Sequence, residues 1–263
     1  MFEQIDTNQH RSTPPALFNT LTELPRAMLE VGGLLSVLPT LSLLPRGDQH
    51  PVLLIPGFMA GDRSLVMLKR YLDFMGYQSE TWGFGRNTGS PDHLFDHLPE
   101  KLDELCEKYG EPLSLVGQSL GGVFARELAR DYPEKVRQII TLGSPVAARN
   151  SAVTVRALRH LLKASAGQSV EEMVVMMEER NFHISPEVPV TAVFSKGDGV
   201  VHWASCKEGF EDESTQNIEV PGSHCGMGFN ALIYFIIMNR LSQQLDSWQK
   251  FQWQSFGLSP ARV

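Results

Sequence analysis

The chain has 263 residues, of which 42% are hydrophobic and 20% are charged, a composition typical of a soluble globular protein with a sizeable core. Its formal net charge is −7 and its lysines and arginines are not clustered. This balance argues against a nucleic-acid partner, because phosphate binding requires concentrated positive charge.

The first 50 residues are expected to form an arm that packs on the rest of the chain. They begin without the basic and apolar regions of a secretory signal, so a cytoplasmic location is the default expectation. A helical pattern covers residues 21–29, and an uncharged apolar segment follows at 31–45. This segment is too short to span a bilayer, and Pro39 is expected to break it. The alternative to packing is an interfacial element with peripheral membrane contact near a greasy substrate entrance.

Strands and helices alternate from residue 51 to the C-terminal region. Apolar runs predict strands at 52–55, 77–82, 113–116, 136–142, 188–194 and 217–220, and helical patterns lie at 64–72, 91–109, 123–129, 202–210 and 230–245. Such alternation is typical of a mostly parallel, doubly wound α/β sheet. One domain over 51–263 is therefore expected.

A region of helical composition interrupts the alternation at about 146–187. It contains several methionines, whose flexible side chains would give an adaptable apolar face. We interpret it as a small helical cap. The alternative is a set of additional core helices without a role at a site.

Residues 117–121 are Gly-Gln-Ser-Leu-Gly, placed between an apolar strand and a helical pattern. A strand that reverses directly into a helix leaves no room for a Cβ at Gly117 or Gly121, and it presents Ser119 at the apex of the turn. The pattern therefore predicts a nucleophile elbow with Ser119 exposed and strained.

Two further polar residues follow predicted strands, Asp198 after 188–194 and His224 after 217–220. The carboxyl ends of parallel strands are where such sheets bind ligands. A serine becomes a good nucleophile when an imidazole takes its proton and an acid orients the imidazole. Ser119, His224 and Asp198 thus predict nucleophilic catalysis. The alternatives are Asp198 as a turn residue and His202 as the base.

With the elbow, the strand alternation and the order Ser, Asp, His, the chain resembles the α/β-hydrolase superfamily and its serine esterase and lipase-like members. The resemblance covers essentially everything after His50. It implies an α/β-hydrolase fold with Ser119 as the nucleophile, Asp198 as the acid and His224 as the general base.

The resemblance also implies an oxyanion hole made of two backbone amides. One belongs to Leu120, directly after the nucleophile, and the other to Phe58 in the loop after an earlier strand, with Met59 as the alternative donor. Arg86 and Asn87 either support this edge through side-chain hydrogen bonds or form a structured turn.

The expected activity is hydrolysis of carboxylic esters through an acyl-enzyme. The apolar arm, the methionines of the cap and Phe58 favour a fairly hydrophobic acyl group, so the expected partner is a small-molecule or lipid-like ester. The alternatives are acyl transfer or thioester hydrolysis with the same residues, and a non-catalytic binding protein of this fold. The sequence leaves the oligomeric state open.

No cofactor or metal is expected. The glycine-rich stretch 83–89 lacks a basic anchor and a helix directly behind it, so it is a weak phosphate-loop match. His93 and His97 have a ligand-like spacing, but no further ligand follows at a matching distance. Cys206 and Cys225 are expected to be reduced thiols, with a bridge between them as the alternative.

Overall fold

The computed structural model describes residues 13–147, 164, 172, 175, 179–180, 184–244 and 248–253. Most of the predicted cap at 146–187 therefore lies outside the described residues, as do Met173, Met176 and Met177.

The strands of the described residues form one six-stranded parallel sheet in the order β2-β1-β3-β4-β5-β6. They span Pro51–Ile55 (β1), Gln78–Thr81 (β2), Leu113–Gln118 (β3), Val136–Leu142 (β4), Val190–Phe194 (β5) and Thr215–Glu219 (β6). The central strands are buried along almost their whole length. Burial on both faces explains their continuous apolar runs. The predicted doubly wound α/β architecture is confirmed.

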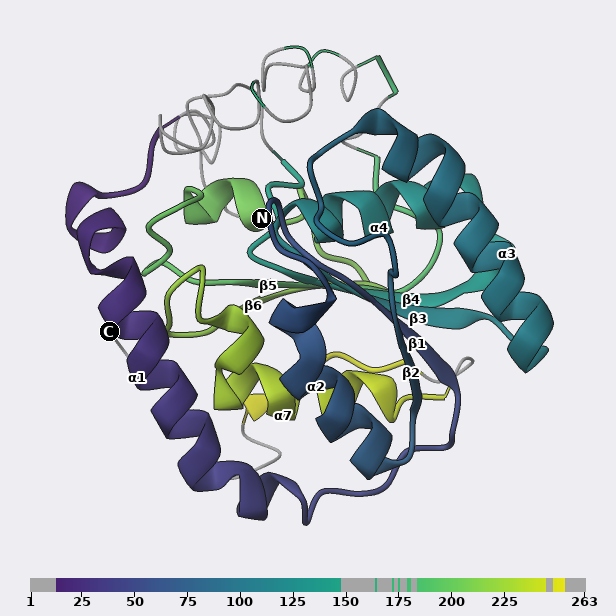
Figure 1. The fold of residues 1–263 in the computed structure, drawn as a ribbon, viewed down its shortest axis with the longest axis horizontal. Helices are drawn as coiled ribbons and strands as arrows, with labels where there is room; N and C mark the ends of the chain where they lie inside the picture. The colour runs from purple at the N-terminus through teal and green to yellow at the C-terminus, as the bar shows by residue number, and fades with distance from the viewer. Residues whose placement is uncertain are drawn as a thin grey trace.

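Helices cover both faces of this sheet (Figure 1). Helices α3 (Leu98–Tyr109) and α4 (Leu120–Asp131) lie on one face, and α2 (Asp62–Met75) and α7 (Ala231–Leu241) lie on the other. Adjacent residues of a strand point to opposite faces. Accordingly, Leu53 belongs to the apolar core under α3 and α4, whereas Leu54 belongs to the core under α2 and α7.

Helix α1 spans Leu17–Leu41 and lies against α7 at the outside of the molecule (Figure 1). The expectation that the chain breaks at Pro39 was wrong, because α1 continues through this proline. Pro39 lies in the last turn, where its missing amide removes one hydrogen bond. The turn is held by tertiary contacts: Leu41 is buried, and the Tyr71 hydroxyl donates to its carbonyl at 3.0 Å.

Two predicted helices differ from those observed. A π-helical turn, His93–His97, precedes α3, and the helix expected at 202–210 is only a 3-10 turn, Trp203–Cys206. There is a physical reason why the helix expected at 202–210 does not continue past this 3-10 turn. The Asn217 side chain bonds both backbone groups of Glu208, accepting from its amide at 2.8 Å and donating to its carbonyl at 3.3 Å. These are the groups that a longer helix would use.

Further 3-10 turns occur at Pro133–Lys135 and Met227–Phe229. Helix α2 begins at Asp62, directly after the N-cap residue Gly61. Of the helices in the described ranges, none combines the length and the apolar character needed to cross a membrane.

Candidate active site

The turn between β3 and α4 has the geometry of a nucleophile elbow. Ser119 has φ 52° and ψ −122°, a combination that costs energy for any residue with a side chain. A Cβ on Gly117 would lie 2.4 Å from the Gly121 carbonyl oxygen, and one on Gly121 would lie 2.3 Å from that of Ile55. Real Cβ atoms do not approach a backbone so closely. Glycine is therefore required at both positions.

Ser119, His224 and Asp198 form a hydrogen-bonded series at the carboxyl edge of the sheet. His224 Nε2 lies 3.0 Å from Ser119 Oγ, and His224 Nδ1 lies 2.6 Å from Asp198 Oδ2. The other carboxylate oxygen of Asp198 accepts from the amides of Val200 and Val201 at 2.8 Å and 2.7 Å. These two bonds leave Oδ2 directed at the imidazole. The structure thus brings together all three predicted residues.

The electrostatic surroundings make His224 a better base than a free imidazole. Burial alone lowers the pKa of His224, but the charge and hydrogen bond of Asp198 and the charge of Glu23 outweigh it. The net effect raises the pKa above the ordinary value of 6.5. An opposite charge held close to the ring stabilises the imidazolium that forms when the base takes a proton.

The loop after β1 lies beside the elbow. A Cβ on Gly57 would be 3.1 Å from Ser119 Cβ, so the two segments are in direct contact. The Met59 amide is already engaged, because it donates to the Asn87 carbonyl at 2.6 Å. Across the described residues, no hydrogen bond occupies the Phe58 amide. The Leu120 amide is at the first position of α4, where a helix provides no internal acceptor.

Asn87 fixes this loop from behind. It is fully buried, and its Nδ2 donates to the Pro56 carbonyl at 2.8 Å while its Oδ1 accepts from the Gly89 amide at 3.0 Å. Its backbone amide donates to the Ala60 carbonyl at 2.7 Å. Of the two roles left open by the sequence, the structure shows the supporting one for Asn87.

The competing residues are occupied elsewhere. His202 Nδ1 accepts from the Ala204 amide at 3.3 Å and caps the 3-10 turn. Cys106, Cys206 and Cys225 are all free, so the bridge between Cys206 and Cys225 is absent. Desolvation and the charge of nearby Glu23 raise the pKa of the Cys225 thiol to about 12. A thiol that stays protonated is not a competing nucleophile.

A second Asp-His-Ser series lies at the opposite, amino end of the sheet. His50 Nδ1 is 2.5 Å from Asp48 Oδ1, and His50 Nε2 is 2.9 Å from Ser114 Oγ. Ser114 is within β3 and has no exposed surface, so a substrate carbonyl cannot reach it. Burial and the charge of Arg137 lower the pKa of His50 despite Asp48. This series is structural. Ser119, which the sequence predicts to be exposed, is half-buried, and this partial exposure and the elbow distinguish it from Ser114.

Two other features, a polar hollow and a pair of histidines, are not part of the series at Ser119. An open polar hollow of about 620 Å³ lies at the same amino end, beside Lys69, Asp73 and Glu80, and not near Ser119. The Nδ1 atoms of His93 and His97 are 3.2 Å apart. In the described ranges, however, no three His, Cys, Asp or Glu side chains are grouped as metal ligands.

Comparison with known sequences gives two matches. The family model described as "alpha/beta hydrolase fold" matches residues 50–169, which include the elbow. The biotin biosynthesis bifunctional protein BioHC of Teredinibacter turnerae is 37% identical over 71 residues. That match covers 27% of this chain and 12% of the BioHC chain, so it spans a small part of a longer protein.

Comparison with solved structures gives lipolytic enzymes. The structure reported for LipS and LipT, two metagenome-derived lipolytic enzymes, has a TM-score of 0.59 at 14% identity, covering 76% of this chain and 96% of the other. The monoacylglycerol lipase of Paleococcus ferrophilus has a TM-score of 0.55 at 15% identity, with the same two coverages. At these identities the likeness is one of fold.

Proposed function

Because the chain belongs to the α/β-hydrolase superfamily, we propose that it is a serine hydrolase that cleaves carboxylic esters through an acyl-enzyme. The observation that carries this proposal is the hydrogen-bonded series from Ser119 through His224 to Asp198. Nucleophile, base and acid are in contact at the sheet edge where this fold binds ligands. The lipolytic structural neighbours support an ester as the substrate.

The proposed reaction has two halves. His224 Nε2 takes the Ser119 hydroxyl proton as Oγ attacks the ester carbonyl carbon, and the negative oxygen that forms accepts hydrogen bonds from the amides of Phe58 and Leu120. The carbon–oxygen bond to the alcohol then breaks, and His224 gives its proton to the leaving oxygen. Water repeats the sequence on the acyl-enzyme, releasing the acid and restoring Ser119. Asp198 accepts a hydrogen bond from the Nδ1–H group of His224 throughout and stabilises the imidazolium.

We further propose that the acyl group is hydrophobic and that the ester is reached at a lipid surface. The three charged residues of α1, Glu23, Arg26 and Glu30, all form hydrogen bonds with the chain beneath the helix. The outer side carries no charge, and six large apolar side chains on it are 70–76% exposed: Leu17, Phe18, Leu21, Leu24, Met28 and Leu29. An uncharged apolar helix face beside an active site suits peripheral contact with lipid. The cytoplasmic location stays a prediction.

Labelling with a fluorophosphonate and a series of p-nitrophenyl esters of graded chain length test the activity. We expect the wild type to be labelled and to turn over medium or long chains fastest, and Ser119→Ala to lose both properties. An optimum at acetate would remove the hydrophobic acyl group from the proposal. Dominant transfer to an added alcohol would make the protein an acyltransferase, and absence of labelling would make it a binding protein.

Co-sedimentation with phosphatidylcholine vesicles tests the surface of α1. We expect Leu21→Gln combined with Met28→Gln to reduce the bound fraction. Leu43→Gln, an 82% exposed position beyond α1, is the matched control and should bind as the wild type does. If the wild type is a dimer in solution that the double variant converts to monomer, the apolar face is a contact between copies and the lipid proposal is wrong.

A further inference from the structure

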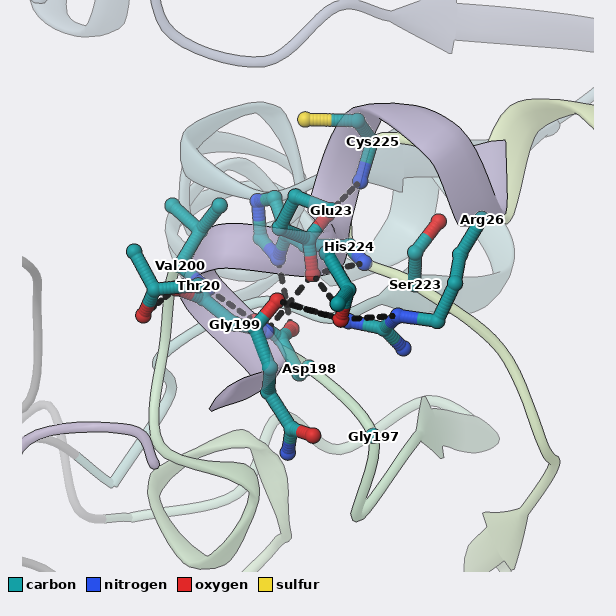
Figure 2. A network of polar contacts seen from close by, with 12 residues as sticks. Thr20, Glu23, Arg26, Gly197, Asp198, Gly199, Val200, Ser223, His224 and Cys225 are labelled. Carbon is teal, nitrogen blue, oxygen red and sulfur yellow. Dashed lines mark hydrogen bonds and ion pairs between the residues drawn. The ribbon is translucent and has the colours of Figure 1, made fainter. Parts of the chain in front are cut away.

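The buried side chain of Glu23 in α1 connects the two loops that carry the proposed acid and base (Figure 2). Its Oε1 accepts from the amide of Gly199 at 2.7 Å and from that of His224 at 3.1 Å. Its Oε2 accepts from the amide of Cys225 at 3.1 Å. Gly199 directly follows Asp198, so one carboxylate holds both loops.

These two loops touch directly through the Ser195 hydroxyl, which donates to the Gly222 carbonyl at 2.7 Å, and Glu23 adds a second connection. The Asp198 loop follows β5 and the His224 loop follows β6, so they have different strands as anchors. The distance of 2.6 Å between His224 Nδ1 and Asp198 Oδ2 nevertheless requires a fixed separation. Hydrogen bonds to a carboxylate are about twice as strong as those between neutral groups. Glu23 supplies three of them at the point where the loops meet.

Helix α1 also contacts the Asp198 loop directly. The Thr20 hydroxyl donates to the Gly199 carbonyl at 2.6 Å, and Asn19 Nδ2 donates to the Lys196 carbonyl at 3.1 Å. A Cβ on Gly199 would lie 2.3 Å from the carbonyl carbon of Asn19, which shows how closely the helix approaches. Glu23 is thus fixed relative to the Asp198 loop by contacts of its own helix.

Charge provides a second link between Glu23 and the imidazole. The acidic groups acting on His224 are Asp198, from the loop after β5, and Glu23, from α1, and both raise the pKa of His224 against the effect of burial. The Arg26 guanidinium pairs with Glu23 at 3.2 Å and is partly exposed. The Cys225 thiol, with its pKa near 12, stays neutral.

Resting on the proposed serine hydrolase function, we propose that Glu23 is a positioning residue of the active site. From α1 it holds the Asp198 and His224 loops at the separation that the acid–base pair requires, and it keeps a negative charge beside the imidazole. Helix α1 is then a functional part of the site, although it precedes the first strand of the sheet.

Glu30 is a matched control on the same helix. Its Oε1 accepts from the amide and the hydroxyl of Ser223, both at 2.7 Å, so it also anchors the His224 loop. It does not contact the Asp198 loop through any described hydrogen bond, and it is not among the charges that act on His224. Glu30→Gln therefore measures the effect of losing one anchor of the His224 loop, while the connection between the two loops through Glu23 and the charge of Glu23 stay in place.

The test compares Glu23→Gln, Glu23→Asp and Glu30→Gln with the wild type in fluorophosphonate labelling rate against pH, kcat, KM and Tm. For Glu23→Gln we expect kcat and the plateau labelling rate to fall at least about tenfold, because small displacements of reacting groups are costly. KM should stay within about twofold of the wild-type value. The acidic limb of the pH profile, where the labelling rate falls as His224 becomes protonated, should move to lower pH as the imidazole loses a charged neighbour. Glu23→Asp keeps the charge, so its limb should stay near that of the wild type while kcat falls.

Glu30→Gln should lower Tm but leave the acidic limb in place. The proposal is overturned if the limbs of Glu23→Gln and Glu30→Gln coincide with that of the wild type and both variants lose rate equally, since Glu23 would then be only a structural anchor. If Glu23→Gln does not fold, a wild-type kcat in Glu23→Asp overturns the positioning role.

Failure of the proposed function gives a different result, because the wild type would then not be labelled at all. An NMR titration of the His224 imidazole still tests Glu23 in that case. We expect the pKa of His224 to fall in Glu23→Gln and to hold in Glu30→Gln. An unchanged pKa of His224 in Glu23→Gln contradicts the charge link.

Discussion

Replacing the proposed nucleophile by glycine should make the protein more stable while abolishing its activity. Ser119 has φ 52° and ψ −122°, backbone angles that suit glycine and strain a residue with a Cβ. Ser119→Ala keeps the Cβ and therefore the strain, but it lacks the hydroxyl that faces His224. The difference between the two variants isolates the backbone term.

The magnitude follows from two opposing contributions. Strain of this kind costs about 1–3 kcal/mol, and glycine adds about 0.5–1 kcal/mol of conformational entropy cost relative to alanine. Taking the middle of each range, Ser119→Gly should therefore be more stable than Ser119→Ala by about 1 kcal/mol. For a domain of this size each kcal/mol shifts Tm by about 2–4 °C, which gives a difference of about 2–4 °C.

Calorimetry of both variants at one pH measures this difference, and fluorophosphonate labelling verifies that both are inactive. A Tm of Ser119→Gly at or below that of Ser119→Ala would show that the strain at the elbow does not exceed the glycine cost of about 0.5–1 kcal/mol, and would refute the predicted difference. Equal Tm values for all three proteins would show in addition that the Ser119–His224 hydrogen bond does not affect stability.

Three further predictions concern pH, a buried ion pair and the loop after β1. His224 must be neutral to act as the base, and its raised pKa keeps it protonated up to a higher pH. On acidification, kcat/KM should therefore fall to half of its plateau value at a pH above 6.5. A midpoint of this pH profile below 6.5 contradicts the prediction. Glu208→Gln should lower the urea-unfolding free energy by about 3–5 kcal/mol, because it removes the negative charge that pairs with the buried Arg126 at 2.8 Å. Glu104→Gln, in an exposed pair, should change it by less than about 1 kcal/mol, and equal losses would refute the distinction. Asn87→Ala should reduce kcat about tenfold or more by releasing the loop that carries one proposed oxyanion donor, and an unchanged kcat would show that the loop holds its place without it.

The sheet and the elbow could be predicted because local chemistry decides them. A strand buried on both faces must be apolar along its length, and a turn without room for a Cβ must use glycine, as at Gly117 and Gly121. Both requirements leave a mark within a few neighbouring residues. The sequence therefore also places Ser119, Asp198 and His224 at strand ends, where the structure finds them in contact.

The features that the sequence did not reveal depend on distant partners. The bonds of Glu23 join positions 176 to 202 residues apart, and nothing in the local pattern of α1 distinguishes this glutamate from one facing solvent. The 3-10 turn after His202 is not extended into a helix, because the side chain of Asn217, in β6, forms hydrogen bonds with the backbone amide and carbonyl of Glu208. Helix α1 similarly passes Pro39 because tertiary contacts hold its last turn.

The long separation between Glu23 and its partners has a consequence for biosynthesis. The elbow is complete once α4 has been made, but the histidine that would activate Ser119 follows 105 residues later. Its loop must then meet α1, which is made before the elbow. Until that loop has been made, the growing chain carries the proposed nucleophile without the base that would take its proton, and reactivity would arise only when the His224 loop joins α1.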